Sequence, residues 1–228
     1  RYASSPGARM GGTDHSSARI ERYLQLCAES NMTIAQPSTP ANYFHLLRRH
    51  TLSSIVRPLI VATPKSMLRM KAATSPLEDF TQRKFRSVID DPYFYDRTQL
   101  HDPSSVKTLV LCSGKVYYEL ARRRDAESRY DLAIARLEQI YPVPFRRRYE
   151  LVARYPQVEK VVWVQEEPSN QGAWPFLKVK LPTVVGNLPP FEHFSRRSMS
   201  APATGVSSVN HAEQNLLMDT VFSTTLPQ

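Results

Sequence analysis

The chain has 228 residues, of which 41% are hydrophobic and 22% are charged, and its formal net charge is +9. No apolar run approaches the roughly 18 residues that a membrane-spanning helix needs, so we predict no membrane span. Such a length fits one large domain or two small ones. The two cysteines, Cys27 and Cys112, have no metal-ligand spacing, and we expect buried, reduced thiols in a cytoplasmic protein.

The basic surplus indicates anionic partners such as phosphates, nucleic acid or acidic metabolites. It equally fits a fragment whose missing portion carries compensating acidic residues. Four short clusters hold much of the positive charge, namely Arg48-Arg49, Arg122 to Arg124, Arg146 to Arg148 and Arg196-Arg197.

The first third of the chain alternates helices and strands. Apolar spacing predicts a helix over 17–29, capped by Asp14 or Ser16, and a short strand over 32–35. Thr39 followed by Pro40 is typical of a helix start. The apolar run over 59–62 then predicts a strand buried on both faces.

Residues 63–105 differ in composition, because they contain four prolines and an aromatic cluster. We interpret them as a crossing between two parts of the fold, with one short helix near 80–88.

From residue 106 the alternation resumes, which predicts a mostly parallel α/β sheet with right-handed crossovers. The expected strands are 106–112, 132–135, 160–165 and an edge strand at 193–197. The expected helices are 114–124, 145–154, 173–181 and 209–222.

Several catalytic signatures are missing from the sequence. There is no G-x-G-x-x-G, no P-loop, no G-x-S-x-G and no paired C-x-x-C, and we predict no metal-ligand set.

The most informative stretch is Asp14-His15-Ser16-Ser17-Ala18-Arg19-Ile20-Glu21-Arg22, where a loop becomes an amphipathic helix. Free N–H groups at a helix start favour anions, and an imidazole there can bind or protonate an anionic substrate. The spacing alone favours a structural role for His15, as a residue that caps the helix or packs against it, over a catalytic role. Glu21 and Arg22 are interpreted as an exposed charged face.

The sequence motif DHSSAR-x-ER resembles the corresponding segment of the 2-oxoglutarate dehydrogenase family. Members of this family are the thiamine-diphosphate-dependent component that decarboxylates the substrate. Further segments resemble the same family in the same order, and the match is best with its actinobacterial branch. They include PSTPANYFHLLRRH, RPLIVATPKSMLR, LCSGKVYYEL, RLEQIYPVP, QEEPSNQGAWPF and HAEQNLLMDTVF.

The resemblance implies the end of a pyrimidine-binding-type parallel-sheet domain, followed by a transketolase-like C-terminal α/β domain. Residues 1–13 then form a divergent leader, 14–70 the end of the pyrimidine-binding domain, 71–105 a linker and 106–228 the C-terminal domain. The domain that binds the diphosphate is absent, so the main ligands of thiamine diphosphate and Mg²⁺ are not in this chain.

The resemblance further implies that His15 is catalytic, facing 2-oxoglutarate or the intermediate formed from it. The parent enzyme would be a cytoplasmic bacterial homodimer that serves a lipoyl-bearing acyltransferase component or releases succinic semialdehyde. We expect the isolated chain to be inactive.

The actinobacterial branch also binds an acetyl-CoA activator between the two domains. Carried over position by position, that allosteric site would comprise Thr33, Arg49, Lys84, Ser87, Gln139, Arg146 and Arg147. The guanidinium groups of arginine form paired hydrogen bonds with phosphate oxygens. The alternative interpretation of Arg146 to Arg148 is a solvent-exposed helix start. Two alternatives stay open: a noncatalytic module that binds CoA or another anion, nucleic acid included, and a truncated gene product.

Overall fold

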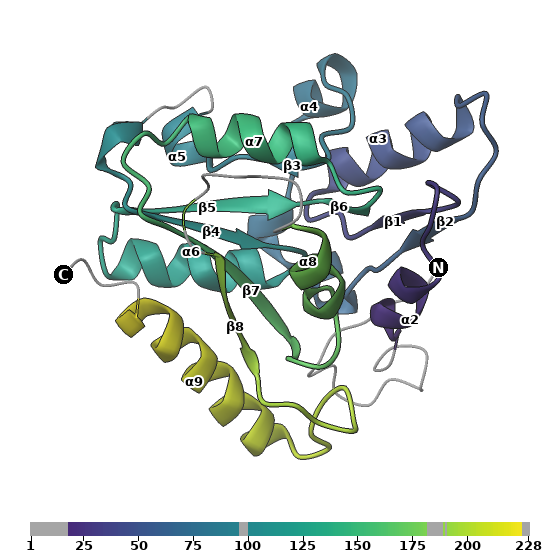
Figure 1. Ribbon diagram of the computed structural model, residues 1–228. Helices are drawn as coiled ribbons and strands as arrows, with labels where there is room; N and C mark the ends of the chain where they lie inside the picture. Colours follow the sequence, from purple (N-terminus) through teal and green to yellow (C-terminus); the bar gives the residue numbers. More distant parts are fainter. Residues whose placement is uncertain (1–17, 96–99, 182–188, 190, 225–228) are drawn as a thin grey trace.

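The computed structural model describes residues 18–95, 100–181, 189 and 191–224, and shows two sheets with helices packed around them (Figure 1). The larger sheet has the order β3-β5-β4-β7-β8 and the smaller one the order β2-β1-β6. Strands β5, β4, β7 and β8 run parallel to one another, and β3 is antiparallel to β5. The expected α/β class with a mostly parallel sheet is confirmed.

The strands of both sheets have these bounds: β1 (Thr33–Ala35), β2 (Leu59–Val61), β3 (Val88–Ile89), β4 (Thr108–Cys112), β5 (Leu132–Leu137), β6 (Gln139–Tyr141), β7 (Lys160–Pro168) and β8 (Phe191–Arg196). The α-helices are α2 (Ile20–Gln25), α3 (Pro40–Thr51), α4 (Leu77–Gln82), α5 (Pro92–Tyr95), α6 (Val116–Ala126), α7 (Phe145–Ala153), α8 (Trp174–Lys180) and α9 (Ser207–Thr224). Three short 3₁₀ helices cover Lys65–Arg69, Lys71–Ala73 and Pro103–Ser105.

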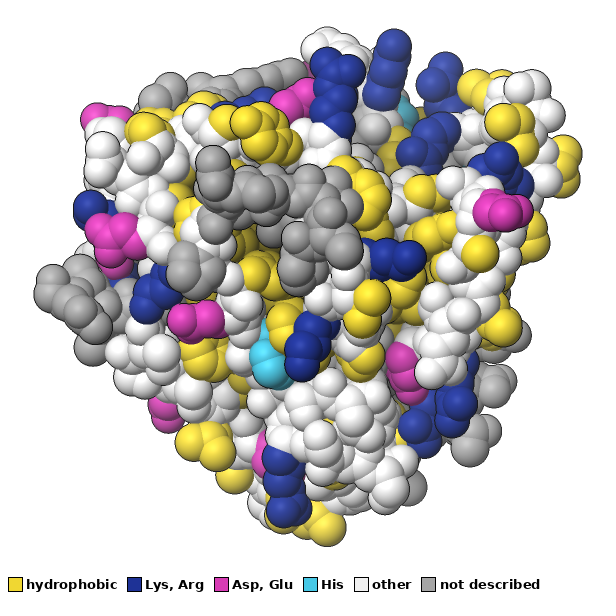
Figure 2. All heavy atoms as spheres, in the orientation of Figure 1, with side chains coloured by type: hydrophobic (Ala, Val, Ile, Leu, Met, Phe, Trp, Pro, Cys, Tyr) yellow, Lys and Arg dark blue, Asp and Glu magenta, His cyan; other side chains and the backbone are white. Residues whose placement is uncertain are grey.

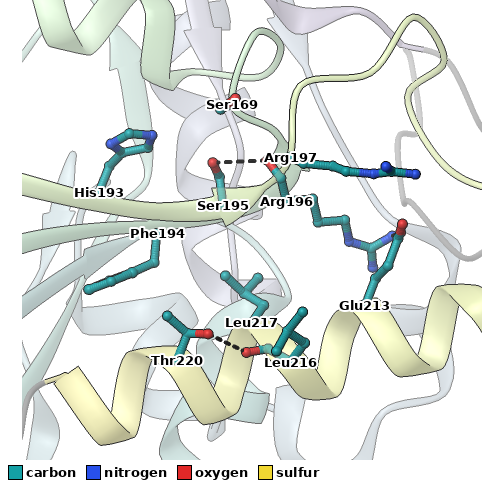
Figure 3. Close-up of a pocket in the computed structure, with 10 residues that line it drawn as sticks. All are labelled: Ser169, His193, Phe194, Ser195, Arg196, Arg197, Glu213, Leu216, Leu217 and Thr220. Atoms are coloured by element: carbon teal, nitrogen blue, oxygen red, sulfur yellow. Dashed lines mark hydrogen bonds and ion pairs between the residues drawn. The ribbon is translucent and has the colours of Figure 1, made fainter.

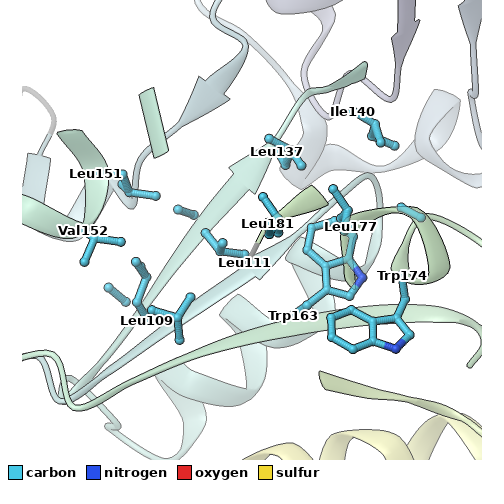
Figure 4. Packing of buried hydrophobic residues seen from close by; sticks show 14 of the residues in the cluster. Leu109, Leu111, Leu137, Ile140, Leu151, Val152, Trp163, Trp174, Leu177 and Leu181 are labelled. Carbon is cyan, nitrogen blue, oxygen red and sulfur yellow. The ribbon is translucent and has the colours of Figure 1, made fainter. Parts of the chain in front are cut away.

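The larger sheet is buried on both faces, as its continuous apolar strands require. One face packs Leu109 and Leu111 of β4 and Trp163 of β7 against α7 and α8 (Figure 4). The other face packs Val110 and Cys112 against α6 and α9. Alternate residues of one strand therefore belong to two separate cores.

Strands β5 and β6 are separated by the single residue Glu138, and they belong to different sheets. Strand β6 pairs antiparallel with β1, whereas β5 pairs with β4. One continuous segment thus joins the two sheets. The segment expected to be a linker, 71–105, also contributes to the fold, because it contains β3, which pairs with β5 at the edge of the larger sheet.

Two expected helices differ from the structure. The first covers only Ile20–Gln25 instead of 17–29, and its N-cap residue is Arg19; the expected caps Asp14 and Ser16 lie outside the described residues. Beyond it, Glu29 and Ser30 have left-handed φ angles of 49° and 56°, which end any helix.

The helix expected at 80–88 is also wrong, because α4 ends at Gln82 and residues 88–89 form β3. The amide of Asn42 explains the difference. Its Oδ1 accepts from Arg86 N at 2.9 Å and its Nδ2 donates to Arg86 O at 3.0 Å, which takes both backbone groups of Arg86 away from a helix.

Other boundaries follow the sequence. Thr39 accepts from Asn42 N and Pro40 opens α3, as the Thr-Pro pair predicts. Cys27 and Cys112 are both free thiols, but only Cys112 is buried as expected, whereas Cys27 is half-buried. Burial raises the pKa of each, that of Cys27 to about 11. Within the described residues, none of the helices combines the length and the apolar character needed to cross a membrane.

Candidate functional site

The predicted catalytic residue His15 lies outside the described residues, as do Asp14, Ser16 and Ser17. Helix α2 begins at Ile20, five positions after His15 in the sequence. Glu21 is not on an exposed face, contrary to expectation, since only 14% of its side-chain surface is accessible. Arg22, by contrast, is exposed as expected.

The loop between β7 and α8 is organised by the buried side chain of Gln165. Its Nε2 donates to the carbonyl oxygens of Glu167, Pro168 and Gln171, and its Oε1 accepts from Trp174 N at 2.9 Å and from Trp163 Nε1 at 3.0 Å. Five hydrogen bonds to one amide fix the path of this loop. The loop lies at the carboxyl end of a parallel strand, where open α/β sheets bind ligands.

Three of the predicted acetyl-CoA residues lie together where the two sheets meet. Arg49 Nη2 donates to Gln139 Oε1 at 2.6 Å, linking α3 to β6. The backbone oxygen of Ser87 accepts from the N–H groups of Glu138 and Gln139, at 2.9 and 3.1 Å. Gln139 Nε2 donates to Pro142 O at 2.8 Å, so both ends of its amide are bonded within the protein.

The guanidinium of Arg49 also stacks on an aromatic ring. Its Cζ lies 4.1 Å from the centroid of Phe85, and burial lowers the pKa of Arg49 from its usual value. A guanidinium that stacks on a ring and hydrogen-bonds through one edge is held in place while its other donors stay available.

The remaining acetyl-CoA candidates surround this group on neighbouring elements. Thr33 opens β1, two positions before Ala35, the residue that pairs with Gln139. Lys84 is exposed just before Phe85. Lys and Arg side chains gather along the upper edge of the molecule, where Figure 1 shows α7, α4 and α3 (Figure 2).

Arg146 and Arg147 open helix α7 and both face solvent. Their side chains are 92% and 66% exposed, and each bonds to Glu150 at 2.9 Å. The hydrogen bond from Arg146, then that from Arg147, lowers the pKa of Glu150. An exposed ion pair of this kind contributes little to stability, so both guanidinium groups can exchange Glu150 for a ligand anion.

Other arginine clusters have structural partners that the sequence pattern did not reveal. Arg124 is buried and forms an ion pair with Asp91, which also accepts from Ile134 N at 2.7 Å. Burial raises the pKa of Asp91, and the charge of Arg124 opposes that shift. Arg196 is likewise buried, bonded to Glu213, Asn210 and Gln214.

A pocket of about 420 Å³ lies between β8 and α9 (Figure 3). Phe194, Leu216 and Leu217 supply apolar surface, while Arg196 and Glu213 form an ion pair on its wall. The guanidinium of Arg196 is shared by three side chains of α9, whereas Arg197, which also lines the pocket, is exposed. The sequence predicted β8 as an edge strand, and it occupies the edge of the larger sheet.

No group of three or more His, Cys, Asp or Glu side chains suited to a metal ion occurs among the described residues.

Two protein-family models match this chain. The model described as transketolase, pyrimidine binding domain, matches residues 3–71, and the model described as 2-oxoglutarate dehydrogenase C-terminal matches residues 74–222. The second match alone covers more than half of the chain.

Several curated relatives are similar to nearly the whole chain. The "2-oxoglutarate dehydrogenase E1/E2 component" of Corynebacterium glutamicum is 55% identical over 212 residues, which is 92% of this chain and 17% of that protein. Proteins named "Multifunctional 2-oxoglutarate metabolism enzyme" from Mycolicibacterium vanbaalenii and a Mycobacterium species are 56% and 54% identical, with 92% and 93% of this chain covered. The chain spans 17% of the length of each of them. By these matches, the chain belongs to the 2-oxoglutarate dehydrogenase family.

Proposed function

We propose that this chain is the C-terminal portion of a thiamine-diphosphate-dependent 2-oxoglutarate dehydrogenase or decarboxylase. The observation that carries the proposal is the 55% identity to the Corynebacterium glutamicum protein over 92% of the chain. The chain spans only 17% of that relative, so we infer that it supplies only part of the active site.

The described residues do not fit a diphosphate–magnesium site. They contain no carboxylate or histidine cluster suited to a metal ion, and the chain has only seven glycines, which leaves little scope for a glycine-rich phosphate loop. Thiamine diphosphate and Mg²⁺ would therefore be held elsewhere in the parent enzyme.

Within the parent enzyme, His15 would face 2-oxoglutarate. A histidine titrates near neutral pH, so it can donate a hydrogen bond to the substrate carboxylate or move a proton during turnover. The parent enzyme would act in the bacterial cytoplasm as a homodimer, with a lipoyl-bearing acyltransferase component as the acceptor of the product.

The direct test is a decarboxylation assay of the purified 228-residue chain with 2-oxoglutarate, thiamine diphosphate and Mg²⁺. We expect no release of carbon dioxide above the rate without protein. Measurable turnover by the chain alone would overturn the assignment of the cofactor site to other parts of the parent enzyme.

A second function, binding of acetyl-CoA as an allosteric activator, is supported by the Arg49–Gln139 contact at the junction of the two sheets. Phosphates of the ligand would pair with the exposed Arg146, Arg147 and Lys84. Ser87, Thr33 and the amide of Gln139 would line the same region, with Gln139 exchanging an internal hydrogen bond for one to the ligand.

Calorimetric titration of the chain with acetyl-CoA tests this second function. Saturable heat with acetyl-CoA, and none with an adenine mononucleotide, is the expected result. Absence of heat, combined with DNA binding that weakens steeply with salt, would favour a nucleic-acid-binding module instead.

A further inference from the structure

The pocket of about 420 Å³ between β8 and α9 has no role in the functions proposed above (Figure 3). None of the residues predicted for acetyl-CoA lines it, since they belong to the other end of the larger sheet and to the smaller sheet. Its volume lies within the range of roughly 300–1,000 Å³ that small-molecule sites occupy. The chemistry of its walls therefore indicates which ligand it suits.

Much of the pocket wall is apolar. Leu217 of α9 is buried, whereas its neighbour Leu216 is 66% exposed. Phe194 lines the pocket from β8 and packs against the same core as Leu217. A ligand with a hydrocarbon part would remove the exposed surface of Leu216 from water and so gain affinity.

The end of the pocket next to the end of β8 carries an excess of positive charge. Arg196 and Arg197 both line the pocket, and Glu213 is the carboxylate in its lining. Figure 3 shows both arginine side chains extending to the side on which Glu213 rises from α9. Arg197 is exposed, and its guanidinium has no hydrogen bond or ion pair within the described part of the chain. Two guanidinium groups and one carboxylate leave one positive charge for a ligand.

Arg196 is a buried cation whose donors are only partly used. Its side chain is 2% exposed, and only its bond to Gln214 is short, at 2.8 Å. The bonds to Glu213 and Asn210 are both 3.4 Å long. Arg196 Nε and Asn210 Nδ2 are buried and have no hydrogen-bond partner among the described residues. Since buried donors without an acceptor are unfavourable, Arg196 gains from an anionic acceptor at its end of the pocket.

We propose that the β8–α9 pocket binds an aliphatic monocarboxylate. The carboxylate pairs with the guanidinium groups of Arg196 and Arg197, which suit it in charge and geometry. The hydrocarbon tail covers Phe194, Leu216 and Leu217. Because the lining leaves a single positive charge, it favours a monocarboxylate over a dicarboxylate such as 2-oxoglutarate. The inference is independent of the proposed function.

Octanoate is the probe, and two compounds separate its charge from its tail. Octanol keeps the chain length without the charge, and acetate keeps the charge without the chain. Calorimetric titration of the 228-residue chain should show saturable binding of octanoate, octanol binding that is weaker by roughly tenfold, and no binding of acetate. Absence of octanoate binding, or equal affinities for octanoate and octanol, would overturn the proposal.

Two exposed lining residues test the two halves of the ligand. Arg197→Ala should abolish the preference for octanoate over octanol and leave octanol binding unchanged. Leu216→Ala should weaken both ligands equally, by about three- to tenfold. Substitutions of exposed side chains keep the fold.

Matched controls are Arg122→Ala and Val209→Ala, which change exposed residues outside the pocket lining, the second on α9 itself. Both should bind octanoate as the wild type does. An Arg197→Ala variant with the octanoate affinity of Arg122→Ala would contradict the assignment of the carboxylate to Arg197.

The location of the ligand is measured by ¹⁵N-resolved NMR. Octanoate should shift the backbone amide signals of Phe194, Arg197 and Leu216 and leave those of α3 in place. Largest shifts in α3 or α7 would place the anion beside Arg49 or Arg146 and overturn the proposal. Neither measurement uses 2-oxoglutarate, thiamine diphosphate or Mg²⁺, so a failure of the proposed enzymatic function leaves both results interpretable.

Discussion

Asn42 of α3 donates a hydrogen bond from Nδ2 to Glu138 Oε2 at 2.8 Å, joining the two sheets through a fully buried carboxylate. Glu138 also accepts from Ser38 N at 2.8 Å and from Ser38 Oγ. Arg136 Nη1 donates to the same Ser38 hydroxyl at 3.1 Å. This network lies where β5 leaves one sheet and β6 enters the other.

Removing the carboxylate should therefore weaken the junction of the sheets. We expect Glu138→Ala to lower the free energy of unfolding by about 3–5 kcal/mol, because it leaves Arg136 as an uncompensated buried charge. Urea denaturation followed by circular dichroism measures this. The exposed Gln25→Ala should stay within about 0.5 kcal/mol of wild type, and equal effects of the two changes would contradict the role given to Glu138.

Gly172 should tolerate no side chain. Its φ of 69° and the 2.8 Å approach of Glu167 Cβ predict that Gly172→Ala costs about 1–3 kcal/mol of stability. Gly205 provides a matched control, because a Cβ there meets nothing within 4 Å. Thermal unfolding of both variants checks the difference, and a Gly172→Ala protein as stable as Gly205→Ala would refute the packing of the loop.

The pKa of Glu167 also predicts how stability depends on pH. In the unfolded chain this carboxyl has a pKa near 4.5 and in the folded chain about 7. The folded state therefore binds this proton more tightly than the unfolded chain does. The stabilisation that the proton on Glu167 provides is complete below pH 4.5 and is lost as the pH rises through 7. The loss amounts to up to about 3 kcal/mol.

Glu167→Gln should remove that part of the pH dependence. Urea denaturation at pH 5 and pH 8 should show a smaller fall in stability for the variant than for the wild type. The same fall in both proteins would show that Glu167 is not the group responsible. Glu159→Gln, at an exposed carboxylate, should leave the dependence unchanged.

The acetyl-CoA proposal predicts different effects for two adjacent arginines. Arg49 is bonded to Gln139 and stacked on Phe85, whereas Arg48 is simply exposed on the same helix. Losing a charge-assisted hydrogen bond costs about 1.5–3 kcal/mol, so Arg49→Ala should weaken acetyl-CoA binding by roughly 10- to 100-fold. Calorimetry should show little change for Arg48→Ala, and equal affinities of the two variants would exclude Arg49 from the site.

Local signals predicted much of the fold. Thr39 and Pro40 marked the start of α3, and continuous apolar runs marked the central strands β4 and β7, which are buried on both faces. The short strands β3 and β6 were missed. They have two and three residues and form through pairing with distant strands, so they leave no periodic pattern.

The roles of charged residues were harder to predict than the elements. Arg124 and Arg196 sat in basic clusters, yet both are buried with acidic partners far away in sequence. Glu21 was assigned to an exposed face because its partner, the N–H of Gly172, carries no sequence signature. The resemblance of longer segments did predict the family, which the family models and relatives show.

The most direct test of the proposed function is a chimaera in which this chain replaces the matching 17% of the Corynebacterium glutamicum relative. Release of carbon dioxide from 2-oxoglutarate is measured for the chimaera and for its His15→Ala variant, both checked for equal folding by circular dichroism. The account predicts an active chimaera whose turnover falls by roughly 10²- to 10⁴-fold on loss of the imidazole. A chimaera that turns over equally well with His15→Ala would contradict it.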